Sequence, residues 1–109
     1  MALLKGTLDV LVLKALSWGP MHGFEITSWL EDRSEGRVEV VDAALIQALH
    51  RMEERGLVVA EWGITSKARR ARYYQLTEAG RAKLREESAA LVDHVAALTA
   101  ILTARTARS

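Results

Sequence analysis

The chain contains no cysteine among its 109 residues. A disulfide framework, a thiolate metal site and a cysteine nucleophile are therefore all excluded. The absence also fits a reducing compartment, so we expect a cytoplasmic protein. Proline is nearly absent too, with a single residue, whereas half of the residues are apolar and 27% are charged. This composition is typical of a folded, helix-rich soluble protein and not of a disordered chain.

Long hydrophobic runs are also lacking. No stretch approaches the roughly 18 to 20 apolar residues that a membrane span needs, so we expect no membrane contact. The opening MALLKGTLDVLVLKALSW is superficially similar to a signal peptide, but Asp9 and Lys14 interrupt it and no small-x-small cleavage site follows. At this length we expect one domain with a modest core, so that any large further apolar surface is shared with a second subunit.

A strong overall charge is missing as well, because the formal net charge is +1. The charges are unevenly distributed along the chain. Residues 1–61 carry 6 Lys/Arg against 10 Asp/Glu, whereas residues 62–85 carry 7 against one. Such a local basic patch attracts a polyanion even on a near-neutral protein, since phosphate attraction acts over a Debye length of roughly 8 to 10 Å.

Apolar periodicity predicts two helices in the first third of the chain. The first covers residues 3–18 and is apolar on most of its circumference, so it must be covered on more than one side. Gly19 and Pro20 then form a turn, and the second helix covers residues 21–33. Its predicted core face consists of Phe24, Ile26, Trp29 and Leu30.

A third helix is predicted from Asp42, whose side chain is expected to cap it, to about residue 55, with Gly56 at its end. On a helical wheel the apolar face and the polar face separate cleanly. The apolar face consists of Leu45, Leu49 and Met52. The exposed face consists of Ala43, Gln47, His50 and Glu54, with Arg51 beside them.

Two β-rich runs follow, LVVAEW and RARYYQL, joined by GITSKAR, and they predict a β-hairpin. In the second run Tyr74 and Leu76 share a face with Arg70 and Arg72. We expect the two apolar residues to pack on the core and the arginines to lie toward the hairpin tip. Trp62 is expected to pack the hairpin onto the core.

Thr77 then caps a last helix of about 27 residues, about 40 Å long, with Glu78 in its first turn. A heptad seam runs along it at spacings of 4, 3, 4, 3 and 4. Its members are Leu84, Ser88, Leu91, Val95, Leu98 and Leu102. Because this helix is longer than the globular part, it requires a partner.

Three helices, a hairpin and a flanking helix occur in the order of a winged helix-turn-helix. The predicted fold class is therefore mainly α with a small β-hairpin, extended by a long C-terminal dimerisation helix. We assign residues 1–76 to a DNA-binding domain, residues 77–104 to the dimerisation helix and residues 105–109 to a flexible tail.

Five stretches in the correct order resemble the PadR family of transcriptional regulators: GTLDVLVLKAL, GPMHGFEI, ALHRMEERGLV, AEW and RARYYQLTEAG. The resemblance implies a homodimer that binds a roughly palindromic operator in double-stranded DNA, with repression as the family expectation. In many members a small-molecule effector releases the DNA. The single terminal helix resembles that of a compact subgroup, in which an aromatic-lined pocket at the dimer interface can hold flat ligands, so a small aromatic effector is an implied partner. The implied dimer contacts are Leu4, Leu8, Leu11, Leu84, Leu91, Val95, Leu98 and Leu102.

Trp18, at the end of the interfacial first helix, is a candidate for lining that effector pocket, although core packing is the favoured interpretation. The family usually has a tyrosine where this chain has Ile46, so a hydroxyl that could touch DNA is missing. Gln47 is the best candidate for reading a base edge, because glutamine can pair bidentately with adenine. The predicted base contacts are Ala43, Ala44, Gln47, His50 and Arg51.

Arg51 could equally form a salt bridge with Glu53 or Glu54. A cluster of charged residues usually lies in a solvated turn. Here the placement on the hairpin, which is the wing of a winged helix-turn-helix, and the family resemblance favour phosphate binding. The predicted backbone contacts are Lys67, Arg69, Arg70, Arg72 and Tyr73.

Catalysis is not expected, because nothing pairs a nucleophile with a base and no glycine-rich phosphate loop is present. His22 and His94 lack acidic or histidine neighbours at ligand spacing, so we expect no metal and no cofactor.

The alternative to a DNA-binding regulator is a dimeric protein-interaction module whose basic hairpin binds an acidic partner. It accounts for the seam and the hairpin, but not for the small residues Ala43 and Ala44 on the exposed face of the third helix.

Overall fold

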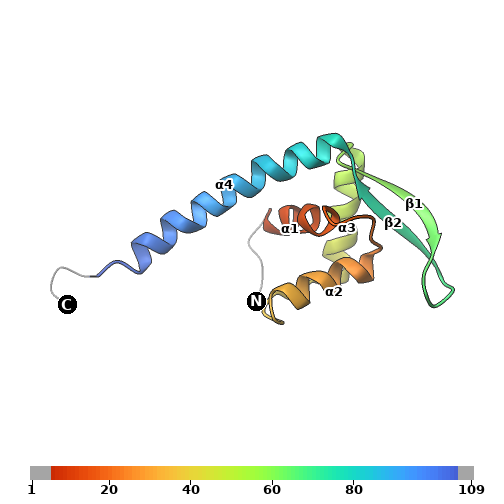
Figure 1. Ribbon diagram of the computed structural model, residues 1–109, viewed down its shortest axis with the longest axis horizontal. Helices are drawn as coiled ribbons and strands as arrows, with labels where there is room; N and C mark the ends of the chain where they lie inside the picture. The colour runs from red at the N-terminus through yellow and green to blue at the C-terminus, as the bar shows by residue number, and fades with distance from the viewer. Residues whose placement is uncertain (1–5, 106–109) are drawn as a thin grey trace.

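The computed structural model describes residues 6–105, which form four helices and one hairpin. Their order is α1 (Thr7–Leu16), α2 (Gly23–Arg33), α3 (Asp42–Glu54), β1 (Val58–Ile64), β2 (Arg70–Leu76) and α4 (Glu78–Leu102). Three short helices and the hairpin form a body from which α4 projects (Figure 1). The predicted fold class, mainly helical with a two-stranded hairpin, is confirmed.

Helix α1 lies at the centre of the body and contacts α2, α3, β2 and α4. It is therefore covered on several sides, as its apolar circumference predicts. Its buried residues are Val12, Leu13, Ala15 and Leu16. The helix ends at Leu16, earlier than predicted, because the Ser17 hydroxyl donates a 2.6 Å hydrogen bond to the Lys14 carbonyl and the chain turns there. The predicted start at residue 3 lies outside the described residues.

Helix α2 begins later than predicted because His22 caps it. The Glu25 N–H donates to His22 Nδ1 (3.3 Å), and the His22 N–H donates to Glu25 Oε1 (3.1 Å), which together form a capping box. Met21 is thereby left extended, and it exchanges two backbone hydrogen bonds with Tyr74 of β2, at 3.1 and 2.8 Å. The start of α2 is thus attached to the hairpin.

The predicted core face of α2 is only partly correct. Ile26 and Leu30 are buried and Trp29 packs against the core, but Phe24 is 75% exposed. Phe24 is in the first turn of α2, where its ring lies on the surface beside the His22 ring, with the centroids 6.5 Å apart. This departure places a large apolar side chain on the surface.

Helix α3 has the two predicted faces, with Leu45, Leu49 and Met52 buried. The predicted cap is wrong: Val41 occupies the N-cap position without a side-chain hydrogen bond, and Asp42 is the first helical residue. The Asp42 carboxylate still lies in the first turn, where its negative charge interacts favourably with the positive end of the helix dipole. Gly56 follows the helix with a φ of 72°, the left-handed conformation that ends many helices.

The hairpin is antiparallel, with Val58 opposite Leu76 and Ile64 opposite Arg70. Tyr74 and Leu76 are buried, which confirms the predicted inward face. Trp62 was expected to pack on the core, and this is wrong because its side chain is 62% exposed. It lies further toward the tip than the core reaches, opposite Arg72.

Helix α4 is capped by Thr77 as predicted, since the Thr77 hydroxyl accepts from the Gly80 N–H at 3.0 Å. The same hydroxyl donates to the Gly56 carbonyl at 2.7 Å, which fixes the start of α4 to the end of α3. The helix has 25 residues, close to the predicted length, and Gly80 is the one that is fully buried. Within residues 6–105, no helix is long and apolar enough to cross a membrane.

Candidate nucleic-acid interface

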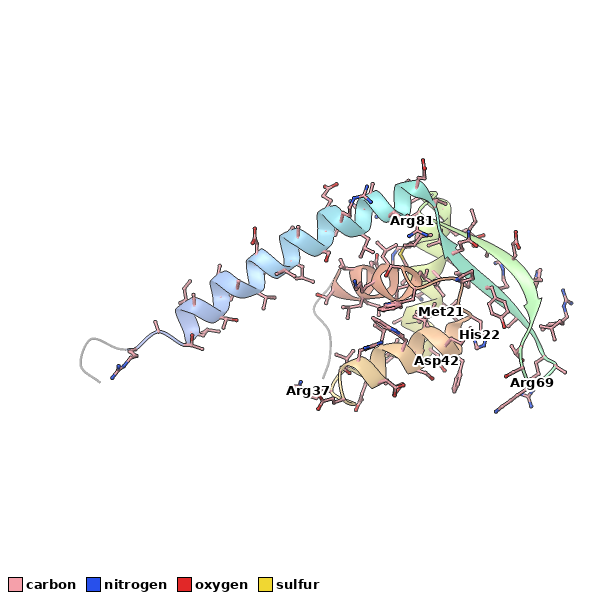
Figure 2. All side chains as sticks on the ribbon, viewed as in Figure 1. Met21, His22, Arg37, Asp42, Arg69 and Arg81 are labelled. Carbon is pink, nitrogen blue, oxygen red and sulfur yellow. The ribbon has the colours of Figure 1, made fainter. Side chains whose placement is uncertain are left out.

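The starts of α2 and α3 and the hairpin tip lie on the same side of the molecule. In Figure 2, His22, Asp42 and Arg69 mark these three places, and Arg81 at the start of α4 lies far from Arg69. A groove of about 840 Å³ runs between the α2–α3 corner and the hairpin. Its lining combines apolar side chains of the helices with basic side chains of the hairpin.

The exposed face of α3 is polar and small, as predicted. Ala43, Ala44, Gln47 and His50 are all exposed. Arg51 differs, because its guanidinium Nη2 lies 3.0 Å from Asp9 Oδ1 of α1. The predicted alternatives for this ion pair, Glu53 and Glu54, are wrong. Arg51 is therefore directed toward α1, while the other four residues remain free to approach a ligand.

Lys67, Arg69 and Arg70 are exposed at the hairpin tip. The loop that carries Lys67 and Arg69 is ordered by Thr65, whose hydroxyl accepts from the N–H groups of these two residues, at 3.3 and 3.2 Å. The Thr65 N–H also donates to the Arg69 carbonyl at 2.8 Å. Lys67 and Arg69 are thus held on a defined loop at the rim of the groove, and Arg70 follows as the first residue of β2.

Arg72 has a different environment from the other wing arginines. Its Nη2 donates to Glu53 Oε2 of α3 at 3.0 Å, and its guanidinium carbon lies 5.7 Å from the Tyr74 ring centroid. Its Nε is buried and has no hydrogen-bond partner within residues 6–105. Arg72 therefore ties the hairpin to α3, so that the hairpin is held beside this helix.

Two aromatic residues of the hairpin are also engaged. The Tyr73 ring meets the His22 ring edge-on at 5.3 Å, and it covers Gly63, where a Cβ atom would lie only 2.7 Å from Tyr73 Cδ1. The Arg70 guanidinium carbon lies 4.6 Å from the centroid of the Trp62 ring. These stacks keep the wing side chains ordered near the groove.

The residues expected at the dimer interface are distributed between the body and α4. Leu8, Leu11 and Leu84 pack partly against the core, and Leu91 is half-buried, whereas Val95, Leu98 and Leu102 are exposed. Leu4 lies outside the described residues. A hollow of about 290 Å³ separates α1 from α4 and is lined by Gly6, Thr7, Val10, Glu87, Ala90, Leu91 and His94.

Trp18, the candidate for an effector pocket, does not line that hollow. The side chain is 65% exposed, so the favoured interpretation of core packing is wrong. Its ring centroid lies 6.5 Å from that of Trp29, and the Arg33 guanidinium lies over both rings, at 5.7 and 5.3 Å. Arg33 therefore covers part of the aromatic surface that a flat ligand would need.

Sequence reasoning missed several residues that organise the site. His22 had a local signal, because His-Gly-Phe-Glu has the spacing of a capping box with histidine in place of serine. Asp9 and Glu53 had none, since each pairs with an arginine distant in sequence, 42 and 19 residues away. No group of three or more His, Cys, Asp or Glu side chains within the described part of the chain could hold a metal ion.

The fold and this surface define a winged helix-turn-helix protein. The family model of the PadR-like transcriptional regulators matches residues 12–86, and the chain belongs to that family. It is therefore a transcriptional regulator and not an enzyme. An uncharacterized protein of Lysinibacillus sphaericus is 26% identical over 84 residues, which are 77% of either chain.

Solved structures share the fold over most of the chain. A PadR family transcriptional regulator from Eggerthella lenta is 27% identical, with a TM-score of 0.75 over 93% of this chain and 86% of that one. A PadR-like transcriptional regulator from Bacillus cereus has a TM-score of 0.78 at 21% identity, over 93% and 96%. Bacillus subtilis PadR in complex with operator DNA has a TM-score of 0.65 at 20% identity, over 72% and 45%.

Proposed function

We propose that this regulator is a sequence-specific DNA-binding repressor that binds a palindromic operator as a homodimer. The observation that carries the proposal is the joint placement of the exposed α3 face and the basic wing tip on one side of the body (Figure 2). A recognition helix and a wing on one face can contact a major groove and the adjoining backbone together. The structurally similar Bacillus subtilis PadR in complex with operator DNA supports this assignment.

Base discrimination comes from α3. Ala43 and Ala44 are exposed and small, so the start of the helix can approach the base edges closely. Gln47 and His50, on the same exposed face, supply the hydrogen-bonding groups. One good bidentate contact of this kind discriminates by about 1 to 3 kcal/mol against a wrong base. Arg51 takes part in positioning α3 on α1 through Asp9.

The wing supplies affinity that does not depend on sequence. Lys67, Arg69 and Arg70 are exposed and have no carboxylate partner within residues 6–105, so their charges are available to phosphates. Arg72 and Tyr73 hold the wing in place through Glu53 and His22, and they reach the backbone from that position. Each phosphate contact releases condensed counterions, and affinity therefore falls with salt.

Two subunits pair through α1 and α4, with residues 77–104 as the dimerisation helix and residues 1–76 as the DNA-binding domain. The exposed apolar residues of α4 supply the surface for this pairing. The two α3 helices then lie about 34 Å apart, one turn of B-DNA, and enter successive major grooves. A flat aromatic effector at the subunit interface changes their spacing and releases the operator, in proportion to its preference for one dimer state.

The test is fluorescence anisotropy of the purified protein on the DNA upstream of its own gene and on a scrambled duplex of equal length, at two salt concentrations. We expect tight, salt-dependent binding with a preference of about a thousandfold or more for the upstream DNA. Weak and equal binding to both duplexes would contradict the proposal and favour the interaction module with an acidic protein partner.

A pair of charge-matched variants isolates the wing. The double variant Arg69→Ala, Arg70→Ala should lower the affinity for both duplexes. It should also reduce the slope of log affinity against log salt concentration by about two, because two phosphate contacts are lost. Arg81→Ala with Arg85→Ala removes the same charge from exposed positions on α4 and leaves both quantities nearly unchanged. Equal losses in the two variants would show that only overall charge matters and that the wing has no specific role.

A further inference from the structure

The groove beside α3 is unusual in exposing large apolar side chains next to basic ones. Phe24 of α2, Ile46 of α3 and Trp62 of β1 all line it and are 75%, 52% and 62% exposed. Clustered exposed apolar side chains of this kind mark contact sites. Trp62 already has the Arg70 guanidinium 4.6 Å from its ring centroid. The Phe24 ring lies 6.5 Å from the His22 ring, centroid to centroid, and is still 75% exposed. Within residues 6–105, Ile46 has no guanidinium over it, and both side chains leave apolar surface for a ligand.

Ile46 lies where the groove meets the recognition face of α3. Its neighbours Leu45 and Leu49 are buried and line the same groove, whereas Gln47 and His50 are exposed. Isoleucine neither donates nor accepts a hydrogen bond, so it cannot read the polar pattern of a base edge. The apolar group that B-DNA presents in the major groove is the C5-methyl of thymine.

The charge at the rim identifies the occupant as DNA. Lys67, Arg69 and Arg70 line the groove and are exposed, which suits the regularly spaced phosphates of DNA. Glu25 is the acidic residue on the lining, and its Oε1 accepts from the His22 N–H at 3.1 Å while it lies 3.5 Å from His22 Nε2. Its charge is thereby directed toward the helix cap.

We propose that Ile46 is a specificity-determining residue that contacts the C5-methyl group of a thymine in each half-site. Phe24 extends the same apolar surface toward the start of α2. The inference rests on the proposed function, because it requires α3 to enter the major groove. It adds a recognition element for thymine to the hydrogen-bonding readout by Gln47.

The test compares the upstream DNA with the same DNA amplified with dUTP in place of dTTP. Uracil keeps every hydrogen-bonding group of thymine and lacks only the methyl. Loss of one buried methyl corresponds to about a fourfold drop in affinity, and loss in both half-sites to about fifteenfold. We expect this drop for the unmodified protein. The scrambled duplex is also made with thymine and with uracil, and any affinity difference between those two duplexes is subtracted.

Two substitutions assign the effect to Ile46. Ile46→Ala retains the helix, since alanine is the best helix former, and it should bind thymine and uracil DNA with nearly equal affinity. Ile46→Gln, of similar length but polar, should behave in the same way. Val59→Ala is the matched control: Val59 is 49% exposed on β1 but does not line the groove, so the full drop should remain.

Three results would overturn the inference. Equal affinity of the unmodified protein for thymine and uracil DNA removes the methyl contact, and an undiminished drop in Ile46→Ala assigns it to another residue. A changed sedimentation coefficient in Ile46→Ala, with an unchanged drop, identifies the groove as a protein contact. A protein that does not prefer its upstream thymine DNA over the scrambled duplex overturns the proposed function as well, which separates the two failures.

Discussion

The body and α4 differ in where their apolar side chains go. The body encloses a core that draws on α1, α2, α3 and both strands, including Leu13, Ile26 and Leu49, each at most 2% exposed. In α4, by contrast, Gly80 alone is fully buried, and large apolar residues remain on its surface. These are Val92, Val95, Leu98, Ile101 and Leu102. The body therefore buries its core within one chain, whereas α4 leaves apolar residues exposed that a partner would bury.

The shape of the molecule reflects the same difference. Its extents are 62 × 28 × 21 Å and its radius of gyration is 16.3 Å. A compact chain of this length has a radius of gyration of about 13 Å. The excess comes from α4, which projects beyond the body over most of its length (Figure 1). We infer a division of tasks in which the body contacts DNA and α4 joins two bodies.

The largest predicted effect is on assembly. Leu91→Glu with Leu98→Glu places two charges in the apolar seam of α4, where pairing would bury them without a partner. Sedimentation should then show monomers where the unmodified protein is dimeric. The control is Ala89→Glu with Ala96→Glu, which adds the same charges at the same spacing on another face of α4 and should remain dimeric. A persistent dimer in the leucine variant would show that the seam is misassigned.

The next effect concerns the joint between the two regions. A Cβ atom at Gly80 would collide with the backbone carbonyl oxygen of Leu57, which cannot move without displacing β1. Gly80→Ala should therefore lower the free energy of unfolding by about 1 to 3 kcal/mol in urea titration. Gly23→Ala is the matched control, because its Cβ would meet only Leu45 Cδ2 at an ordinary 3.8 Å. Equal stability of the two variants would contradict tight packing at the joint.

A smaller effect is predicted within the body, at the contact between Arg72 and Glu53. Glu53→Gln should lower the free energy of unfolding by about 1 kcal/mol, because the charged hydrogen bond is lost at a site only about one-third exposed. Glu54→Gln makes the same charge change at an exposed neighbour and should have little effect. A double-mutant cycle with Arg72→Gln measures the coupling, and additivity of the two changes would exclude a structural role for this pair.

The smallest effect is confined to α4. The hydrogen bond and the negative charge of Glu87, whose Oε1 lies 2.9 Å from Lys83 Nζ, raise the pKa of Lys83 above its ordinary 10.5. Folding thus favours protonated Lys83, so its contribution to stability is present below that ordinary value and is lost as pH rises through the raised pKa. NMR titration should show the raised pKa, and Glu87→Gln should abolish the rise. An unchanged pKa in that variant would exclude Glu87 as the cause.

The elements of the fold could be predicted because each has its own local signal. The 3.6-residue periodicity of α3, the Thr77 cap and the β-rich runs of the hairpin are all confirmed. The heptad seam of α4 divides in the structure: Leu84 packs against the core and Leu91 is half-buried, whereas Val95, Leu98 and Leu102 are exposed. Boundaries were less accurate where an unusual capping residue sets them, as His22 does at the start of α2.

The finer geometry of the site could not be predicted, because it depends on residues distant in the sequence. The pairs Arg51–Asp9 and Arg72–Glu53 form only when α1, α3 and the hairpin pack together. The exposure of Trp62 could not be predicted for the same reason. Its sequence context predicts a strand residue that packs on the core, but β1 extends beyond the core and Trp62 lies on that extension. Local patterns give an element and its face, but not how far the core extends.

The most direct test of the division of tasks measures the DNA affinity of the variant with Leu91→Glu and Leu98→Glu. If the body binds DNA and α4 joins two bodies, this variant should lose its affinity for the upstream duplex by on the order of a hundredfold or more, since two linked reading heads become one. Its binding to the scrambled duplex should change by only a fewfold, because the wing is intact. A monomeric variant that retains the full preference for the upstream duplex would contradict the account.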